Sequence, residues 1–288
     1  MSSITTTPLR VAISPCPNDV FIFAGWILGK TPAPRATFIY EDIETLNGIA
    51  SGLPQGRAGD VGAIDLIKIS YANVPQCPAY LPLDCGGALG RGCGPLLLTG
   101  GAPFNPDAEV LVPGEHTTAN FLLDFWFQKS GLAEQGGVTR KLRKRFVPFD
   151  ALYRELREHQ DAQGVVIHEM RFTYARDGLS LVRDLGEHWE AITGGPIPLG
   201  VVVYRGGADL PIAPEIETAI RASLDWALAH EEEALALCAL HAQEMDPVVM
   251  RSHIDLYVNA FSRQLGAEGA AAVDLFLNQL AVVSHHTR

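Results

Sequence analysis

Long hydrophobic runs and paired cysteines are both missing from this 288-residue sequence. No run of about 18 apolar residues occurs, so the sequence predicts no membrane-spanning helix. The five cysteines form no Cys-x-x-Cys pair, and the spacing of Cys77, Cys85 and Cys93 matches no zinc site, so no metal is expected. The first residues lack a basic segment followed by an apolar one, which predicts no secretory signal. Together with the odd number of cysteines, this favours reduced thiols in the cytoplasm.

Positive charge is scarce as well. There are 22 Lys and Arg residues against 33 Asp and Glu residues, which gives a formal net charge of −11. Nucleic acids and membrane surfaces are polyanions that such a protein repels, although a local cationic pocket can still bind an acidic small molecule. The basic cluster from Arg140 to Arg145 is predicted to be a charged loop and strand edge, with a nucleic-acid patch as the minor alternative.

Segments with the pattern of a β-strand alternate along the chain with segments that have the pattern of a helix. In the first third, strands are predicted at residues 9–14, 36–40 and 64–69, with helices after the first two. Further strands are predicted at 109–112, 145–149, 164–167 and 201–204, with helices at 117–129 and 150–160. From residue 214 the pattern is helical, with breaks near Pro247 and Gly266. The alternation predicts an α/β fold with parallel sheets made of β-α-β units.

Two glycine-rich segments, near residues 101 and 197, are predicted to be the points at which the chain crosses between two lobes. The predicted first lobe comprises residues 1–101 and 197–288, including the helical C-terminal tail. The predicted second lobe is the inserted segment 102–196. Two-lobed α/β proteins bind their ligands between the lobes, so an interlobe cleft is expected to hold the site.

The segment SPCPND, from Ser14 to Asp19, joins the first strand to the first helix. One interpretation is a ligand-binding loop that offers backbone N–H groups together with Asn18 or Asp19. The structural alternative is a proline-stiffened turn in which Asn18 or Asp19 caps the helix, and residue chemistry alone favours this alternative.

Three further positions have side chains suited to binding an anion. Lys68 and Ser70 lie on one face of the third predicted strand, although a single lysine is ordinarily on the surface. Arg91 lies within the glycine-rich run GGALGRGCGP, which matches no nucleotide-binding motif and indicates close backbone approach instead. Thr117 and Thr118 begin a helix, where free N–H groups can bind a carboxylate and where Thr is also a common cap.

His168 follows the strand GVVI, at the type of strand end where α/β proteins place their chemistry. A histidine ordinarily has a pKa near 6.5, which suits proton abstraction at neutral pH. The alternative, and the default for any one histidine, is a partly exposed loop residue. The neighbouring Glu169 points away on an extended chain and is a poor partner for it.

Seven short stretches follow one another along the chain: SPCPND with VFIF, KISYANVP, GGALGRGCGPLL, TTANFLL, GVVIHE, DLGEHWE and GGPIPLG. In this order they resemble the 1,4-dihydroxy-6-naphthoate synthase family of the futalosine route to menaquinone. They cover roughly residues 9–205, and the helical tail is similar in layout only. The resemblance implies a two-lobed fold like that of the type II periplasmic binding proteins.

The resemblance also implies an activity. Cyclic de-hypoxanthine futalosine, a carboxylate-bearing small molecule, would be cleaved to 1,4-dihydroxy-6-naphthoate without a metal or an organic cofactor. His168 would be the general base. The stretches Lys68-Ile69-Ser70 and Thr117-Thr118 would bind substrate, and Asn18, Asp19 and Arg91 would line the cleft. A homodimer is an additional open expectation.

The sequence departs from the family at two places. Val20 stands where a small hydroxyl residue is usual, and the loop from Gly52 to Ala63 is longer than expected. Two alternatives stay open at this point. One is a solute-binding protein that captures an acidic ligand without catalysis, and the other is the related chorismate dehydratase, against which the GGALGRGCGPLL run and the VIHE strand end weigh.

Overall fold

The computed structural model describes residues 7–53, 63–135, 138–206, 213–242 and 246–287, and these form two compact units. The first unit comprises residues 1–89 and 199–269, and the second comprises 90–198 and 270–288. The loop expected to be unusually long, Gly52 to Ala63, lies largely outside the described residues. Within the described residues, every helix is too short or too polar to span a lipid bilayer.

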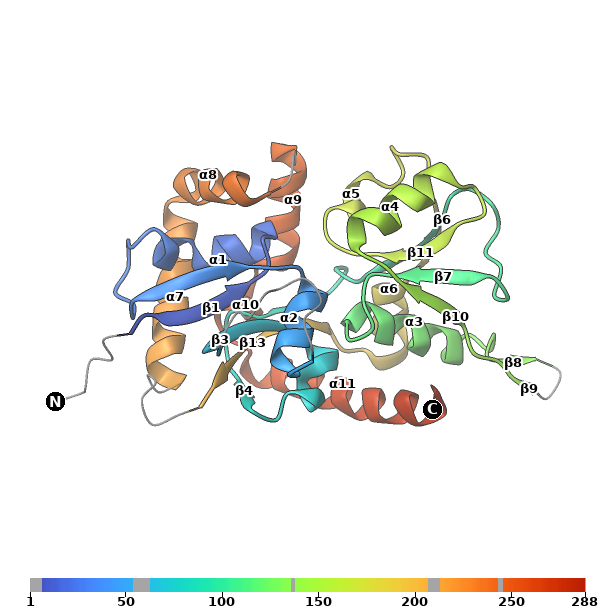
Figure 1. Cartoon of the computed structure of the whole chain (residues 1–288), viewed down its shortest axis with the longest axis horizontal. Coiled ribbons are helices and arrows are strands. Elements are labelled where there is room, and N and C mark those ends of the chain that lie inside the picture. The colour runs from blue at the N-terminus through green and yellow to red at the C-terminus, as the bar shows by residue number, and fades with distance from the viewer. Residues whose placement is uncertain (1–6, 54–62, 136–137, 207–212, 243–245, 288) are drawn as a thin grey trace. The chain divides into compact units, whose positions relative to one another are not determined.

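The first unit is built on a mixed sheet with strand order β2-β1-β3-β13-β4, and β5 pairs with β13 (Figure 1). Its strands are β1 (Leu9–Ile13), β2 (Ala36–Tyr40), β3 (Leu66–Ser70), β4 (Tyr80–Pro82), β5 (Ala88–Gly90) and β13 (Ile197–Arg205). Its helices are α1 (Pro17–Ile27), α2 (Ile43–Ala50), the 3-10 helix η1 (Tyr71–Gln76), α7 (Ala213–Ala229), α8 (Glu231–His241), α9 (Pro247–Tyr257) and α10 (Ala260–Arg263).

Helix α1 is the centre of the first unit's core. Ten of its residues are buried, because apolar side chains cover nearly its whole circumference. It packs against α7, α8 and α9, which come from the far end of the chain. The C-terminal helical tail therefore completes the core of the N-terminal strands, and this explains why the first unit is discontinuous.

The second unit has its own sheet, with strand order β10-β7-β11-β6-β12. Its strands are β6 (Leu96–Thr99), β7 (Glu109–Val112), β10 (Arg143–Phe146), β11 (Gln163–Val166) and β12 (Ser180–Asp184), with the separate hairpin β8 (Glu134–Gln135) and β9 (Val138–Thr139). Its helices are α3 (Thr118–Lys129), α4 (Phe149–Glu158), α5 (Met170–Thr173) and α6 (Leu185–Thr193), and α11 (Gly266–Thr287) belongs to it from residue 270.

Both sheets are mixed, which corrects the expectation of parallel sheets. β1 is parallel to β2 and β3, and β7 is parallel to β10 and β11, as β-α-β units require. The exceptions are the strands next to the two crossings. β13 runs antiparallel to β3, and β6 runs antiparallel to both β11 and β12. A strand that arrives from another unit is not bound by a β-α-β connection, so its direction is free to differ.

The boundaries between the units also differ from the predicted ones. β6 belongs to the second sheet, so the chain has crossed before residue 96, at 89–90 rather than at 101. The tail divides as well, since residues 270–288 join the second unit. There the Phe276 ring lies 4.7 Å from that of Phe121 and 5.5 Å from that of Trp189, all three being buried. These aromatic contacts explain why the last helix leaves the first unit.

Replacing Phe276 tests this aromatic core. Phe276→Ala removes a fully buried ring, and it is expected to lower the free energy of unfolding of the second unit by about 3–5 kcal/mol. Urea denaturation followed by tryptophan fluorescence measures the loss. Leu240→Ala, at a position 80% exposed on α8, is the control and is expected to change stability by less than ~0.5 kcal/mol. Equal effects of the two substitutions would contradict the packing.

Candidate functional site

His168 lies two residues beyond β11, the central strand of the second sheet. All four residues of β11 are buried, and the half-buried His168 leaves the sheet with a backbone φ of 58°. Among the described residues it is the sole non-glycine residue with a positive φ. For a residue with a Cβ atom, this left-handed conformation costs roughly 1–2 kcal/mol. The Phe149 ring packs edge-on against the imidazole, with ring centroids 5.2 Å apart.

Thr117 and Thr118 lie at the same edge of this sheet as His168. They follow β7, which is parallel to β11 with Leu111 opposite Gly164, so both strands end at one edge. The Thr117 hydroxyl caps α3, since its oxygen accepts a hydrogen bond from the Asn120 backbone N–H at 3.1 Å. The hydroxyl O–H in turn donates to the Gly114 carbonyl at 2.8 Å. The capping interpretation of Thr117 is thereby confirmed, and a binding role for the pair stays a prediction.

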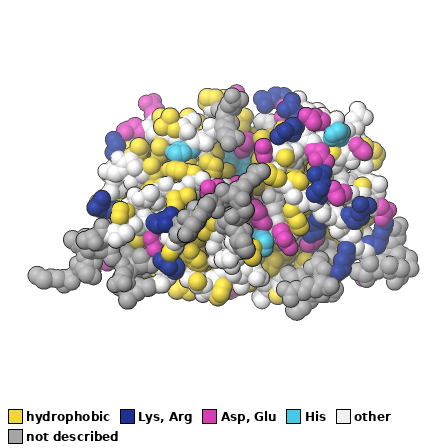
Figure 2. All heavy atoms as spheres, in the orientation of Figure 1, with side chains coloured by type: hydrophobic (Ala, Val, Ile, Leu, Met, Phe, Trp, Pro, Cys, Tyr) yellow, Lys and Arg dark blue, Asp and Glu magenta, His cyan; other side chains and the backbone are white. Residues whose placement is uncertain are grey.

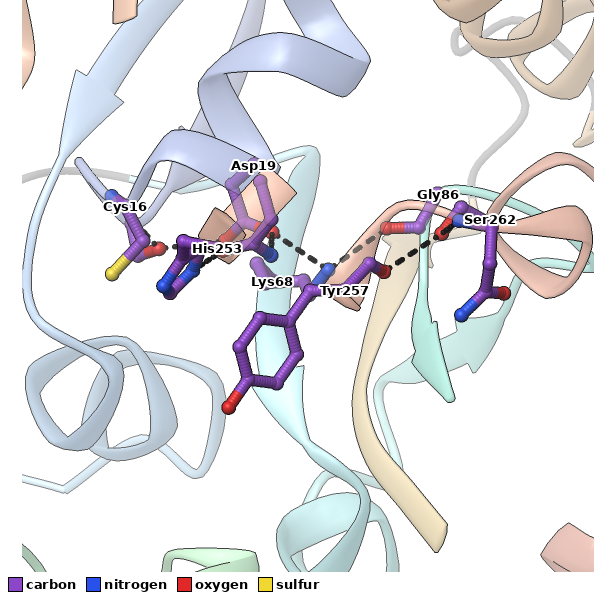
Figure 3. A network of polar contacts seen from close by, with 10 residues as sticks. Cys16, Asp19, Lys68, Gly86, His253, Tyr257 and Ser262 are labelled. Atoms are coloured by element: carbon purple, nitrogen blue, oxygen red, sulfur yellow. Dashed lines mark hydrogen bonds and ion pairs between the residues drawn. The ribbon is translucent and has the colours of Figure 1, made fainter. Parts of the chain in front are cut away.

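A second group of predicted residues meets in the first unit. Lys68 of β3 and Asp19 of α1 form an ion pair with their nitrogen and oxygen 2.8 Å apart, and each side chain is only 3% exposed (Figure 3). The Lys68 ammonium also donates to the Gly86 carbonyl at 2.8 Å. Gly200 on the adjacent strand makes room for the lysine, because a Cβ there would lie 3.0 Å from Lys68 Cε. The expectation from residue type alone, that Lys68 is exposed to solvent, is therefore wrong.

Further hydrogen bonds complete the surroundings of the Asp19 carboxylate. Ser14 Oγ donates to one oxygen at 2.7 Å, and Asn18 Nδ2 donates to the other at 2.9 Å. The Asn18 amide oxygen lies 2.9 Å from Nε2 of His253, which comes from α9. Because this oxygen can only accept, His253 Nε2 carries the proton and donates. A buried carboxylate thus has a cation and two neutral donors around it.

These contacts correct the predicted cap of α1. The N-cap is Cys16 and Pro17 is the first helical residue, whereas the sequence predicts a cap at Asn18 or Asp19. Proline suits this first position, because its fixed φ is helical and its missing N–H would have no partner within the helix. The side chains of Asn18 and Asp19 are buried and turn to β3 and α9 instead.

Ile69, Ser70 and Arg91 occupy different surroundings. Ile69 is buried in the core, and Ser70 exchanges hydrogen bonds with Asn47, whose amide oxygen accepts from the Ser70 backbone N–H at 2.8 Å. Arg91 is exposed and donates to the Gly194 carbonyl at 3.0 Å, at the C-terminal end of α6. A cation there stabilises the negative end of a helix. Roles for these three residues in binding substrate stay predictions.

The basic cluster at residues 140–145 is matched by acidic side chains. β10 is an edge strand, as predicted, and its Lys144 lies 2.7 Å from Asp124 while Arg145 contacts Glu109 and Glu155. Figure 2 shows the same mixture of basic and acidic side chains over the surface of β10 and α4. These ion pairs reduce the positive charge that the cluster presents to solvent, and the absence of a nucleic-acid partner stays a prediction.

Four of the five cysteines are buried. All five cysteines are free, and burial raises the pKa of the Cys85, Cys93 and Cys238 thiols to about 12. These three thiols stay protonated at neutral pH and are poor nucleophiles. Among the described residues, no set of three or more His, Cys, Asp and Glu side chains is arranged to hold a metal ion.

Residues 9–281 match the sequence family described as menaquinone biosynthesis. The chain belongs to this family. It is 40% identical over 276 residues to the 1,4-dihydroxy-6-naphthoate synthase of Streptomyces coelicolor, covering 95% of this chain and 93% of that protein. The synthase of Thermus thermophilus is also 40% identical, over 92% of this chain and 91% of that protein. The resemblance drawn from the ordered motifs is confirmed.

Solved structures share the fold. Protein AF1704 from Archaeoglobus fulgidus has a TM-score of 0.81 at 26% identity, over 97% of both chains. The alkanesulfonate-binding protein SsuA from Xanthomonas axonopodis has a TM-score of 0.63 at 14% identity, over 94% of this chain and 93% of that one. The expected fold, like that of the type II periplasmic binding proteins with a helical C-terminal tail, is confirmed. The cleft expected between the lobes stays a prediction.

His253 is the main residue that the sequence analysis missed. Its signal is present in the sequence, because Met250, His253, Ile254 and Tyr257 follow helical i, i+3, i+4, i+7 spacing and form the buried stripe of α9. A polar residue in such a stripe needs a hydrogen-bonding partner. Its partner, Asn18, is 235 residues away in the chain, so only the tertiary structure identifies it.

Removing the charge of Lys68 tests the buried ion pair. Lys68→Met leaves the Asp19 carboxylate buried without a cation, which is expected to lower the free energy of unfolding by about 3–5 kcal/mol. Combining it with Asp19→Asn is expected to restore much of the loss. The control is Lys30→Met, which breaks an exposed pair with Glu233 and is expected to cost less than ~1 kcal/mol in urea denaturation. A Lys68 loss no larger than this control would refute the account.

The left-handed conformation of His168 predicts an inverted order of two substitutions. His168→Gly is expected to be more stable than His168→Ala by about 1 kcal/mol, because glycine adopts a positive φ without a steric penalty. At Arg154, an exposed position of α4, alanine is expected to be the more stable of the two, as in any ordinary helix. Thermal and urea denaturation of the four variants check the comparison, and the same order at both positions would contradict it.

Proposed function

We propose that this protein is a carbon–carbon lyase that converts cyclic de-hypoxanthine futalosine into 1,4-dihydroxy-6-naphthoate, with His168 as the general base. The observation that carries the proposal is His168 itself, held in a left-handed conformation beyond the end of the central strand β11. Strain of this kind persists only where the surrounding structure maintains it, and it is concentrated at functional sites. Two relatives that are each 40% identical to the chain bear the name of this synthase.

In the proposed reaction, a ring nitrogen of His168 accepts a proton from the substrate. Loss of this proton starts the carbon–carbon cleavage, the sugar-derived fragment leaves, and the remaining ring system becomes aromatic. The reaction needs no metal or organic cofactor. A positioned general base contributes about two to four orders of magnitude to such a rate.

The start of α3 is the preferred place for the substrate carboxylate within this proposal. Thr117 and Thr118 lie at the same sheet edge as His168, and a helix N-terminus favours a negative charge. Lys68 is less suited to neutralise the substrate, because Asp19 already balances its charge. The stretch Lys68-Ile69-Ser70, together with Asn18, Asp19 and Arg91, stays a proposed part of the binding surface.

Cellular location and assembly form part of the same proposal. The five free cysteines suit the reducing cytoplasm, where thiols persist without forming disulfides. A second copy of the chain is the proposed protein partner, with no role for a nucleic acid. Sedimentation of the purified protein distinguishes a monomer from a homodimer.

The decisive experiment measures product formation. Purified protein is incubated with cyclic de-hypoxanthine futalosine, with and without EDTA, and the naphthoate is identified by chromatography and mass. The wild type is expected to form product in both conditions. His168→Asn is expected to lose about two to four orders of magnitude in kcat. Asparagine tolerates the left-handed conformation, so this variant removes the base without disturbing the backbone.

The matched control is His159→Asn, which changes an exposed histidine of the same unit and is expected to keep the wild-type rate. A His168→Asn variant with an unchanged rate would remove His168 from the mechanism. Binding of the substrate without turnover by the wild type would instead favour a capture protein. Turnover of chorismate in a parallel assay would favour the dehydratase.

A further inference from the structure

The left-handed conformation of His168 requires something to hold the chain after β11. Released from its surroundings, a residue with a side chain returns to negative φ, which is lower in energy by roughly 1–2 kcal/mol. His168 is followed by Glu169 and then by α5, whose first turn is closed by a hydrogen bond from the Phe172 N–H to the Glu169 carbonyl. A helix of four residues is too short to be rigid by itself, so the restraint must come from outside it.

Arg171 of α5 supplies contacts to two neighbouring strands. One guanidinium nitrogen donates to the Gly94 carbonyl at 2.7 Å, just before β6. Another lies 2.5 Å from a carboxylate oxygen of Asp184, the last residue of β12. The side chains of Arg171 and Asp184 are 18% and 13% exposed, so solvent weakens this ion pair less than it weakens a surface pair.

The two anchors of Arg171, the Gly94 carbonyl and the Asp184 carboxylate, lie at the end of the sheet where β11 ends. Leu96, the first residue of β6, is paired with Val166, the last residue of β11, and also with Asp184. Gly94 and His168 are each two residues beyond this shared row. The guanidinium of Arg171 therefore connects the chain leaving β11 to the two strands that follow it in the sheet.

The anchors are themselves fixed. A Cβ on Gly94 would lie 2.3 Å from the Cα of Gly186, so the chain before β6 rests directly on the first turn of α6. The second carboxylate oxygen of Asp184 caps α6, accepting from the Gly186 N–H at 2.9 Å and the Glu187 N–H at 3.0 Å. Asp184 thus binds Arg171 with one oxygen and holds the helix with the other.

We propose that Arg171 is a positioning residue, which holds His168 in its left-handed conformation by fastening the turn after β11 to Gly94 and Asp184. Arg171 acts through the backbone of this turn and takes no part in the proton transfer. The consequence for turnover rests on the proposed function of His168, whereas the consequence for the backbone does not. Arginine is required because its planar fork reaches two acceptors at once, while a lysine offers a single charged point.

The first test is kinetic. Arg171→Met is expected to lower kcat by about 10- to 100-fold, because a displacement of about 1 Å of a catalytic group has this effect, while KM stays within about threefold. Arg171→Lys keeps a charge opposite Asp184 but loses the second anchor, so its kcat is expected to stay well below that of the wild type. Arg145→Met is the matched control, since Arg145 also contacts two acceptors in this unit, Glu109 and Glu155, and is expected to keep the wild-type kcat.

The second test needs no enzymatic activity. It compares the Tm loss caused by Arg171→Met in the wild type and in His168→Gly. In the wild type, Arg171→Met releases the turn and His168 can return to a negative φ. The strain energy that is removed in this way offsets part of the Tm loss. Glycine has no such strain to recover, so the Tm loss in that background is expected to be larger by about 2–4 °C.

The outcomes separate this proposal from the proposed function. A Tm loss that is the same in both backgrounds overturns the positioning role, and so does an Arg171→Met variant that keeps the wild-type kcat. If the wild type forms no product, the proposed function fails, and the Tm comparison alone then decides whether Arg171 holds His168. A larger loss in the glycine background supports the positioning role in either case.

Discussion

The contact between Gly94 and Gly186 is the constraint on which the structure around His168, beyond the end of β11, depends. Two backbones approach there more closely than any side chain would permit, which places the start of β6 against the first turn of α6. This contact brings the Gly94 carbonyl and the Asp184 carboxylate within reach of one guanidinium. The glycines therefore contribute to the site without touching a ligand, because they determine where a strand and a helix meet.

The first unit depends on a different kind of constraint. Burying the charges of Lys68 and Asp19 carries a large desolvation penalty, which their mutual attraction offsets only with further hydrogen bonds. Ser14, Asn18 and the Gly86 carbonyl supply those bonds, and His253 connects the group to α9. The network joins segments from the beginning and the end of the chain, so it specifies how the discontinuous unit closes.

Family membership and site structure come from different kinds of evidence. The ordered motifs that resemble the family are short stretches of sequence, and three of them occupy structurally demanding places. SPCPND supplies the buried network around Asp19, GRGCG supplies the close approach at Gly94, and DLGEHWE supplies Asp184 and Gly186. The same fold carries alkanesulfonate binding in SsuA, so the chemistry of this chain depends on such residues rather than on the fold.

The sequence by itself determined part of the local structure. Alternation of apolar segments located strands such as β2 and β7 to the residue, and capping chemistry located the start of α3, because these signals depend on neighbours a few residues apart. Only the tertiary structure decided the direction of β6 and β13, the partner of Lys68, the burial of His253 and the contact of Arg171 with the Gly94 carbonyl. These features join residues far apart in the chain, and no local spacing specifies which buried charge meets which partner or which φ a surrounding structure can enforce.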